Sequence, residues 1–483
     1  MTKTPDWVKN AVFYQIFPDR FAKSPAAIKS HWEASAYEGW DATPTLQGYK
    51  GGNLWGVIDK LDYLKDLGIN AIYFTPIFQS TSNHRYHTHD YYEVDPMLGG
   101  NIAFDALLKA AHEHDIKVVL DGVFNHASRG FFFFNDILEN GPHSPWLDWF
   151  KIHDWPLSAY DGDKPANYEG WIGNRALPEF NTDNPQVKEY IMQIAEYWVH
   201  QGIDGWRLDV PNEIDTPGFW QEFRDRVKAI NPEAYIVGEI WGDASYWLDG
   251  TQFDGVMNYR FTEPTIAFVG GEKYDPEYCQ GELKPYPPIS AAEYAARIDA
   301  LLKLYDWEIQ QTQLNLLDSH DTPRMLTTVG EDKSIFMLAT VLLMTFPGAP
   351  SIFYGDEVAL PGGKDPDSRR VFPKPENWDV EILKSHKQLI ALRHQYPALR
   401  TGTYKTLFAD QSVYVFARVL DEEEIVVAIN VGDEPATAIF LATELKFKTQ
   451  DLVYGSGRLV WHDTLEGRKL EISLPAKSSI IVA

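Results

Sequence analysis

The sequence predicts an α/β protein whose main unit is a closed (β/α)8 TIM barrel, followed by an all-β C-terminal domain. Short β-rich runs alternate with helical stretches up to about residue 395, and some runs, such as 117–123 and 234–240, are apolar almost throughout. Runs of this kind are typical of parallel strands covered by helices on both faces. After residue 400 the helical pattern stops, and alternating runs separated by turn residues follow.

Eight β runs that alternate with helices favour a closed barrel over an open sheet. The expected strands lie at residues 12–17, 69–75, 117–121, 203–209, 235–239, 253–258, 313–318 and 351–354. The expected helices lie at residues 54–67, 104–114, 185–200, 219–230, 291–304, 335–345 and 380–393.

One connection is too long for an ordinary loop. About sixty residues rich in Phe, Trp, Gly, Pro and Asn separate Asp121 from the helix at 185, which predicts a small inserted domain after the third strand. We therefore expect three units. They are a catalytic barrel at 1–126 and 183–398, an inserted domain at 127–182 and a C-terminal β-sandwich at 399–483.

Charge and cysteine content exclude several classes of protein. The chain has 483 residues with 43 Lys and Arg against 69 Asp and Glu, a formal net charge of −26. Such an acidic balance argues against nucleic acid or an anionic membrane surface as the main partner. Cys279 is the single cysteine, so neither an intramolecular disulfide nor a cysteine-based zinc site can form. With no visible secretory signal or membrane-spanning run, we expect a cytoplasmic protein.

The ends of three predicted strands each carry one carboxylate. In a (β/α)8 barrel the reacting groups lie at the C-terminal ends of the strands, and those ends bring Asp209, Glu239 and Asp321 to the same rim. Each could instead be a helix N-cap, which is the common role of a carboxylate after a strand. Their occurrence on three strands favours a shared catalytic role.

The neighbours of two of these carboxylates predict different protonation. Arg207 lies two residues before Asp209 on the same face of its strand and is expected to keep that carboxylate ionised. Glu239 lies among apolar residues, which predicts a raised pKa suited to a general acid. One ionised and one protonated carboxyl is the division of labour in glycoside hydrolysis. No Ser-His-Asp order, Walker loop or GxGxxG motif competes with this interpretation.

Four stretches together resemble the motifs of the α-amylase family of glycoside hydrolases and transglycosylases. They are 121–126 (DGVFNH), 205–209 (GWRLD), 238–241 (GEIW) and 319–321 (SHD), and they occur in the family's order. The segments 15–21, 83–92 and 347–357 are similar to the family's first strand, second loop and eighth strand. The resemblance therefore covers nearly the whole chain.

Within the family, the closest resemblance is to the cyclomaltodextrinase, maltogenic amylase and neopullulanase group. It rests on 209–213 (DVPNE), 239–259 and 365–370 (DPDSRR). We expect three departures from that group: the additional N-terminal β domain is missing before the strand at 12, segment 21–27 lacks a series of oxygen ligands for a calcium loop, and Gly242 replaces a bulkier polar residue.

The resemblance implies roles for the three carboxylates. Asp209 would be the nucleophile that forms a covalent glycosyl-enzyme, Glu239 the general acid and base, and Asp321 a group that binds ring hydroxyls. Two displacements would give net retention at the anomeric carbon.

The resemblance also implies a set of substrate-binding residues. Tyr86 would stack on the sugar being cleaved with Asp90 as its support, and Trp241 would form a platform on the leaving-group side. The complete expected set is Tyr86, Asp90, His126, Arg207, Asn212, Glu213, Trp241, His320, Asp365 and Arg369. No catalytic metal or cofactor is expected, but a structural calcium ion at Asn125 stays an open alternative.

The expected function is hydrolysis of α-1,4 links in malto-oligosaccharides or cyclodextrins, with α-1,6 links as a further target and maltose and glucose as main products. A glucanotransferase or an ordinary α-amylase of the same family is the alternative, and a non-catalytic sugar-binding member is a remote one because all three carboxylates are present. The expected partner is an α-glucan oligosaccharide, and both a monomer and a homodimer stay open.

Overall fold

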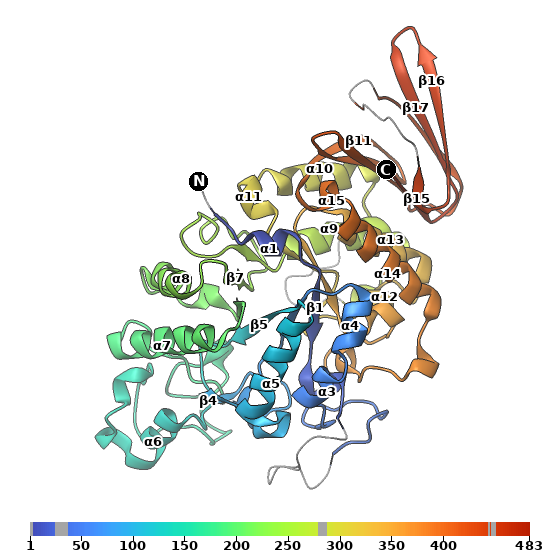
Figure 1. Ribbon diagram of the computed structural model, residues 1–483. Coiled ribbons are helices and arrows are strands. Elements are labelled where there is room, and N and C mark those ends of the chain that lie inside the picture. The colour runs from blue at the N-terminus through green and yellow to red at the C-terminus, as the bar shows by residue number, and fades with distance from the viewer. Residues whose placement is uncertain (1–2, 25–36, 279–286, 443–444, 446–450) are drawn as a thin grey trace.

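The computed structural model contains a parallel barrel, an insertion after its third strand and two further β-sheets at the C-terminus (Figure 1). It describes residues 3–24, 37–278, 287–442, 445 and 451–483. Cys279 and residues 25–27 of the segment considered for calcium lie outside these residues.

The eight barrel strands are parallel and follow the order β8-β7-β6-β5-β2-β1-β10-β9. Their bounds are β1 Phe13–Ile16, β2 Ala71–Phe74, β5 Lys117–Gly122, β6 Gly205–Leu208, β7 Tyr235–Gly238, β8 Gly255–Val256, β9 Leu314–Asn315 and β10 Ala349–Phe353. A parallel bridge from Met257 to Leu314 joins the two end strands, with Asn258 N donating to Leu314 O at 2.8 Å. The predicted barrel is therefore confirmed, and each of the eight strands overlaps the run in which it was expected.

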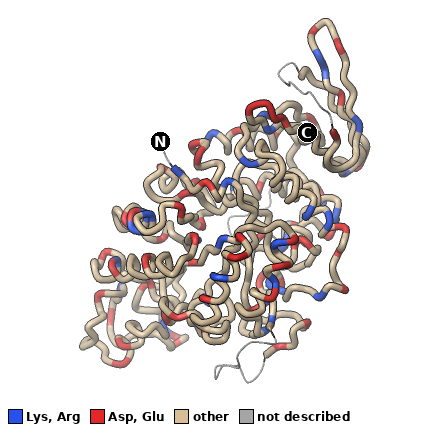
Figure 2. The backbone as a smooth tube through the Cα atoms, in the orientation of Figure 1, with Lys and Arg blue, Asp and Glu red and all other residues tan. Residues whose placement is uncertain are grey.

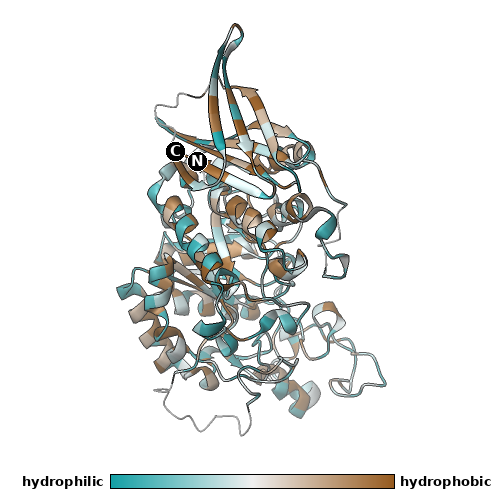
Figure 3. Cartoon of the chain, turned by 90° about the vertical axis from the view of Figure 1, so that its right-hand side faces the viewer, coloured by the Kyte–Doolittle hydropathy of each residue, from teal (hydrophilic) through white to brown (hydrophobic). Residues whose placement is uncertain are grey.

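Helices surround the barrel, and in Figure 3 they carry hydrophilic and hydrophobic residues on different faces. Their bounds are α3 Leu54–Ile58, α4 Leu61–Leu67, α5 Gly100–Glu113, α7 Pro185–Gln201, α8 Phe219–Ile230, α9 Tyr259–Gly270, α10 Ala291–Leu302, α11 Trp307–Gln310, α12 Met325–Thr328, α13 Lys333–Thr345, α14 Val380–Gln395 and α15 Pro397–Thr401. Two short helices, α1 Asp6–Lys9 and α2 Pro18–Phe21, flank β1.

Local signals explain where the longest helix begins and ends. The Asn184 side chain accepts a hydrogen bond from Gln186 N, Pro185 occupies the first turn, and Gly202 ends α7 in a left-handed conformation with φ 104°. By contrast, α9 was not predicted, because Pro264 lies inside it and proline normally interrupts a helical pattern.

The insertion consists mainly of aromatic packing around α6 Phe132–Asn140, at the lower left of Figure 1. Phe133 stacks on Trp146 with ring centroids 4.0 Å apart, and Phe150 stacks on Phe180 at 5.3 Å. A bridge between His126 and Glu179 ties the insertion to the end of β5. A second excursion, the hairpin of β3 Phe78–Ser80 and β4 Thr88–Val94, lies beside it.

The C-terminal domain contains two antiparallel sheets, in the orders β11-β12-β13-β18-β15 and β14-β17-β16. Their bounds are β11 Thr403–Asp410, β12 Val413–Leu420, β13 Glu423–Asn430, β14 Ala436–Leu441, β15 Leu452–Gly455, β16 Arg458–Thr464, β17 Gly467–Leu474 and β18 Ser478–Val482. Apolar side chains from both sheets, including Val415 and Ile472, form one buried cluster between them. The expected all-β domain is confirmed.

Charged residues follow no single pattern along the chain. Figure 2 shows Asp and Glu distributed over the whole described molecule with Lys and Arg among them. None of the described helices combines the length and the apolar character needed to cross a membrane.

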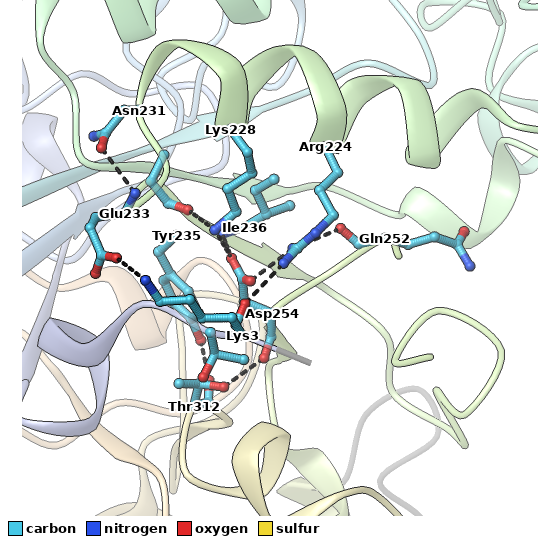
Figure 4. A network of polar contacts seen from close by, with 12 residues as sticks. Lys3, Arg224, Lys228, Asn231, Glu233, Tyr235, Ile236, Gln252, Asp254 and Thr312 are labelled. Atoms are coloured by element: carbon cyan, nitrogen blue, oxygen red, sulfur yellow. Dashed lines mark hydrogen bonds and ion pairs between the residues drawn. The ribbon is translucent and has the colours of Figure 1, made fainter. Parts of the chain in front are cut away.

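One buried charge cluster lies where β7 and β8 begin (Figure 4). The Asp254 carboxylate contacts Arg224 Nη1 at 2.8 Å and Lys228 Nζ at 2.9 Å, and it accepts a hydrogen bond from Ile236 N at 2.9 Å. Since two cations face one fully buried carboxylate, its charge is fully compensated.

Candidate active site

A cavity of about 760 Å³ lies over the C-terminal ends of the barrel strands. Its size is in the range of ligand-binding sites, and both the barrel and the insertion contribute to its wall. Eight of the predicted site residues line it: Tyr86, His126, Asp209, Glu239, Trp241, Asp321, Asp365 and Arg369.

Arg207 organises the carboxylates at the base of this cavity. Its Nη1 lies 3.0 Å from Asp121 Oδ1 and 3.0 Å from Asp209 Oδ1, and its Nη2 lies 3.0 Å from Glu239 Oε2. Arg207 itself is fully buried and does not line the cavity, so it acts on the site through these carboxylates.

Sharing one cation among three carboxylates changes the expected protonation. Burial raises the pKa of Asp209 as well as that of Glu239, because Arg207 lowers each but cannot fully compensate both. The predicted pairing of Arg207 with Asp209 is present, but Arg207 also contacts Asp121 and Glu239, so it does not act on Asp209 alone. The raised pKa of Glu239 is as expected. Burial also raises the pKa of Asp121, to about 7.

The chain after β6 turns sharply to place these groups. Val210 adopts φ 36° and ψ 50°, a left-handed conformation that is unfavourable for a β-branched residue and lies directly before Pro211. This strained turn directs Val210 N toward Glu239 Oε2, at 3.2 Å. Strain of this kind is concentrated at functional sites.

Glu239 is held from its other side by an aromatic pair. Trp241 Nε1 donates to Glu239 Oε1 at 3.2 Å, and the indole stacks on Tyr259 with ring centroids 3.9 Å apart and planes 9° apart. One face of Trp241 is thus occupied by Tyr259, which leaves the other face for the cavity.

Asp321 also lines the cavity and keeps 32% of its side chain exposed. Arg369 Nη2 lies 3.5 Å from Asp321 Oδ1, and Arg369 Nη1 lies 3.1 Å from Asp365 Oδ1. The predicted pair of Asp365 and Arg369 is therefore next to the third carboxylate.

Two histidines and two aromatic rings form stacked pairs at the cavity. His126 stacks on Trp171 at 5.5 Å, and its buried Nε2 has no hydrogen-bond partner among the described residues. Tyr86 stacks on His320 at 5.4 Å with planes 7° apart. A buried donor or acceptor without a partner is costly, which is consistent with a ligand at His126.

Three expected residues lie away from the cavity. Asp90 accepts a hydrogen bond from Tyr92 N at 2.8 Å, whereas the Tyr86 hydroxyl, which Asp90 was expected to support, contacts Asp121 and His320. The alternation of β4 turns Tyr91 into the core and Asp90 the other way. Asn212 and Glu213 are exposed and bonded to each other at 3.0 Å.

A structural calcium ion at Asn125 stays a prediction. Asn125 Nδ2 lies 3.4 Å from His126 Nδ1, and the described chain contains no group of three or more His, Cys, Asp or Glu side chains arranged for a metal.

The sequence prediction omitted Asp121, Tyr259 and Trp171 from the site. Asp121 was recognisable in principle, because adjacent parallel strands place it directly beside Arg207 in register. Tyr259 and Trp171 carry no comparable signal, since Tyr259 begins the unpredicted helix α9 and Trp171 lies in the irregular insertion.

Comparison with known proteins places the chain in a family. The model of the α-amylase catalytic domain matches residues 15–374, and that of the α-amylase C-terminal domain matches residues 402–482. The chain belongs to the α-amylase family. It is a glycoside hydrolase, like its relatives, which are named as a neopullulanase and a cyclomaltodextrinase.

Two relatives and one solved structure illustrate the similarity. The chain is 42% identical to neopullulanase 2 of Thermoactinomyces vulgaris over 97% of its own length and 75% of that protein. It is 44% identical to a cyclomaltodextrinase of Geobacillus thermopakistaniensis over 90% of its length and 71% of that protein. A crystal structure of a debranching enzyme from Nostoc punctiforme is 64% identical, covers both chains fully and has a TM-score of 0.94.

Proposed function

We propose that the enzyme hydrolyses α-1,4- and α-1,6-glucosidic bonds in malto-oligosaccharides, cyclodextrins and pullulan, with retention at the anomeric carbon. The observation that carries this proposal is the group of carboxylates held by Arg207 at the base of a cavity with aromatic walls. The names of the neopullulanase, the cyclomaltodextrinase and the debranching enzyme support the two linkage types.

The proposed chemistry is a double displacement. Glu239, whose pKa is raised by burial, protonates the glycosidic oxygen while Asp209 attacks the anomeric carbon and forms a glycosyl-enzyme. Glu239 then accepts a proton from water, which attacks the same carbon and releases Asp209. Asp321 binds ring hydroxyls and strengthens this contact as the sugar flattens.

This mechanism requires Asp209 to be ionised while Glu239 carries a proton. In the free enzyme Asp209 and Glu239 face the same guanidinium, so one proton between them is favourable. Placing that proton on Glu239 leaves Asp209 the anion paired with Arg207 Nη1, which is the arrangement that the first displacement requires.

Rates on γ-cyclodextrin, maltotriose, soluble starch and pullulan, with products separated by size, test the substrates. Maltotriose released from pullulan would report cleavage of α-1,6 links, and panose would report cleavage of α-1,4 links. Starch cleaved as fast as cyclodextrin would indicate an ordinary α-amylase, and longer oligosaccharides made from maltotriose would indicate a glucanotransferase. An initial product in the β-anomeric form, seen by proton NMR, would contradict retention.

We also propose that the enzyme acts in the cytoplasm on oligosaccharides already inside the cell. The proposal rests on the single cysteine of the sequence, and fractionation of the source cell tests it.

A further inference from the structure

Gln15 is a buried polar residue that the proposed chemistry does not use. It lies on β1 with 1% of its surface exposed and does not line the cavity. Its Nε2 lies 2.7 Å from His320 Nδ1. With its NH2 group toward Nδ1, Gln15 favours the tautomer in which Nδ1 accepts and Nε2 carries the proton, because only one of the two nitrogens can be an acceptor in the neutral ring.

The other nitrogen of His320 faces the catalytic centre. His320 Nε2 lies 2.6 Å from the Tyr86 hydroxyl and 3.1 Å from Asp321 Oδ2. The Tyr86 hydroxyl in turn lies 2.9 Å from Asp121 Oδ2, which Arg207 Nη1 contacts at 3.1 Å.

The direction of this chain of hydrogen bonds follows from its donors. A guanidinium can only donate, so Asp121 accepts from Arg207, and it also accepts the Tyr86 proton. The Tyr86 oxygen is then free to accept from His320, which requires the proton of His320 to be on Nε2. His320 Nδ1 is left as an acceptor, and the amide group of Gln15 that can satisfy it is the NH2.

The surroundings favour a neutral His320. Burial lowers the pKa of His320 well below its ordinary value, and the nearby cations Arg369 and Arg207 lower it further. The titratable and charged groups around the ring are Tyr86 and His84 from the segment after β3, Asp321 from its own loop, Arg369 from the loop after β10 and Arg207 from β6.

We infer that Gln15 is a positioning residue that holds His320 in its neutral Nε2–H tautomer, so that the imidazole donates toward Tyr86 and Asp321. Through this ring the first barrel strand orients two groups of the substrate-binding wall. Neither Gln15 nor His320 lines the cavity, so the effect is transmitted through Tyr86 and Asp321. The part of the inference that concerns catalysis rests on the function proposed above.

The tautomer can be observed directly in the unmodified enzyme. Protein labelled with 15N-histidine, with His320→Gln used to assign the signal, should show a neutral ring protonated at Nε2 from pH 6 to pH 8. A ring protonated at Nδ1, or a doubly protonated ring at pH 7, would overturn the inference. This measurement requires no substrate, so its outcome is independent of whether the enzyme cleaves glucans.

Substitution of Gln15 tests the link to catalysis. Gln15→Glu presents only acceptor oxygens to Nδ1 and therefore draws a proton to that nitrogen. We expect kcat to fall at least about tenfold with KM changed less than about threefold, together with a new ionisation between about pH 5 and pH 8 in the pH profile of kcat/KM. Gln15→Met, which lacks the donor, should lower kcat without adding that ionisation.

Gln310→Met is the matched control, because Gln310 is equally buried in α11 and donates to Leu301 O, away from the cavity. It should lose stability but keep the wild-type pH profile. A folded Gln15→Glu enzyme with wild-type kcat and an unchanged profile would overturn the inference. If Gln15→Glu does not fold, the tautomer of His320 measured in the unmodified enzyme is the test of the inference.

Discussion

The two ends of the barrel differ in the balance of their buried charges. At the N-terminal ends of the strands, Asp254 is one carboxylate between two cations, with a backbone N–H as a further donor (Figure 4). At the C-terminal ends, Arg207 is one cation among three carboxylates. The two central residues, Asp254 and Arg207, are both fully buried, so burial does not distinguish them.

The difference is one of charge balance. In the Asp254 cluster the charge is balanced, because the carboxylate is paired with two cations and a backbone N–H. A fully satisfied polar cluster of this kind stabilises the fold. The Arg207 cluster has more negative charge than it can neutralise, so protons are held there that can be transferred. The same fold thus uses one end for stability and the other for chemistry, which is the usual division in (β/α)8 barrels.

The largest expected effect comes from removing the general acid in the Arg207 cluster, at the end of the barrel where negative charge is in excess (the unbalanced end). Glu239→Gln should lower kcat by about 10⁴-fold or more on unactivated glucosides, because the leaving oxygen loses its proton donor. The melting temperature should stay close to that of the wild type. Steady-state kinetics and thermal unfolding check both, with Glu113→Gln on the outer surface of α5 as the matched control; near-normal turnover would refute the assignment.

Removing the cation of the same cluster should affect activity and stability together. Arg207→Met removes the cation that three buried carboxylates share, so we expect kcat to fall about 10³-fold and the free energy of unfolding to fall by about 3–5 kcal/mol. Denaturant unfolding and kinetics measure the two losses. A variant that kept full stability would show that Arg207 does not compensate these charges.

At the N-terminal ends of the strands, where the charge is balanced, removal of the central charged group should affect stability alone. Asp254→Asn leaves Arg224 and Lys228 without a counterion, and we expect a loss of about 3 kcal/mol in the free energy of unfolding. The value of kcat/KM at a temperature where the variant is folded should stay within about twofold of the wild type. A large change in the pH profile would mean that the two ends are coupled.

The unbalanced end should also set the pH dependence of stability. Burial raises the pKa of Asp121 to about 7, so the folded state keeps a proton that the unfolded chain loses near pH 4. Stability from this group is therefore present at pH 4 and is lost as the pH rises to about 7. The free energy of unfolding should decline over this range, and Asp121→Asn should flatten the decline; an equally steep decline in the variant would contradict the assignment.

The smallest effect is expected at the exposed pair outside the cavity. Glu213 contacts Asn212 and does not line the cavity, so Glu213→Ala should change kcat/KM on maltotriose by less than about threefold. A larger loss, confined to KM, would show that this segment contacts the substrate on the leaving-group side, as the sequence resemblance implied.

Much of this fold could be predicted from the sequence. The eight strand runs and the two departures from the barrel are visible in local patterns of apolar residues, since each parallel strand is buried on both faces. The helix α9 was missed because Pro264 breaks the local pattern, yet packing in the barrel holds the helix around it. The split of the predicted helix at 54–67 into α3 and α4 was also not visible locally.

The sequence by itself determined which carboxylates reach the cavity, because strand ends and family motifs mark Asp209, Glu239 and Asp321. Only the tertiary structure decided how charge and protons are shared among them. Arg207 meets Asp121, Asp209 and Glu239 at the ends of three strands, and Gln15 on β1 meets His320 after β9, with β10 between the two strands. A pKa or a tautomer depends on atoms a few ångströms apart in space, and no local pattern in the chain records those distances.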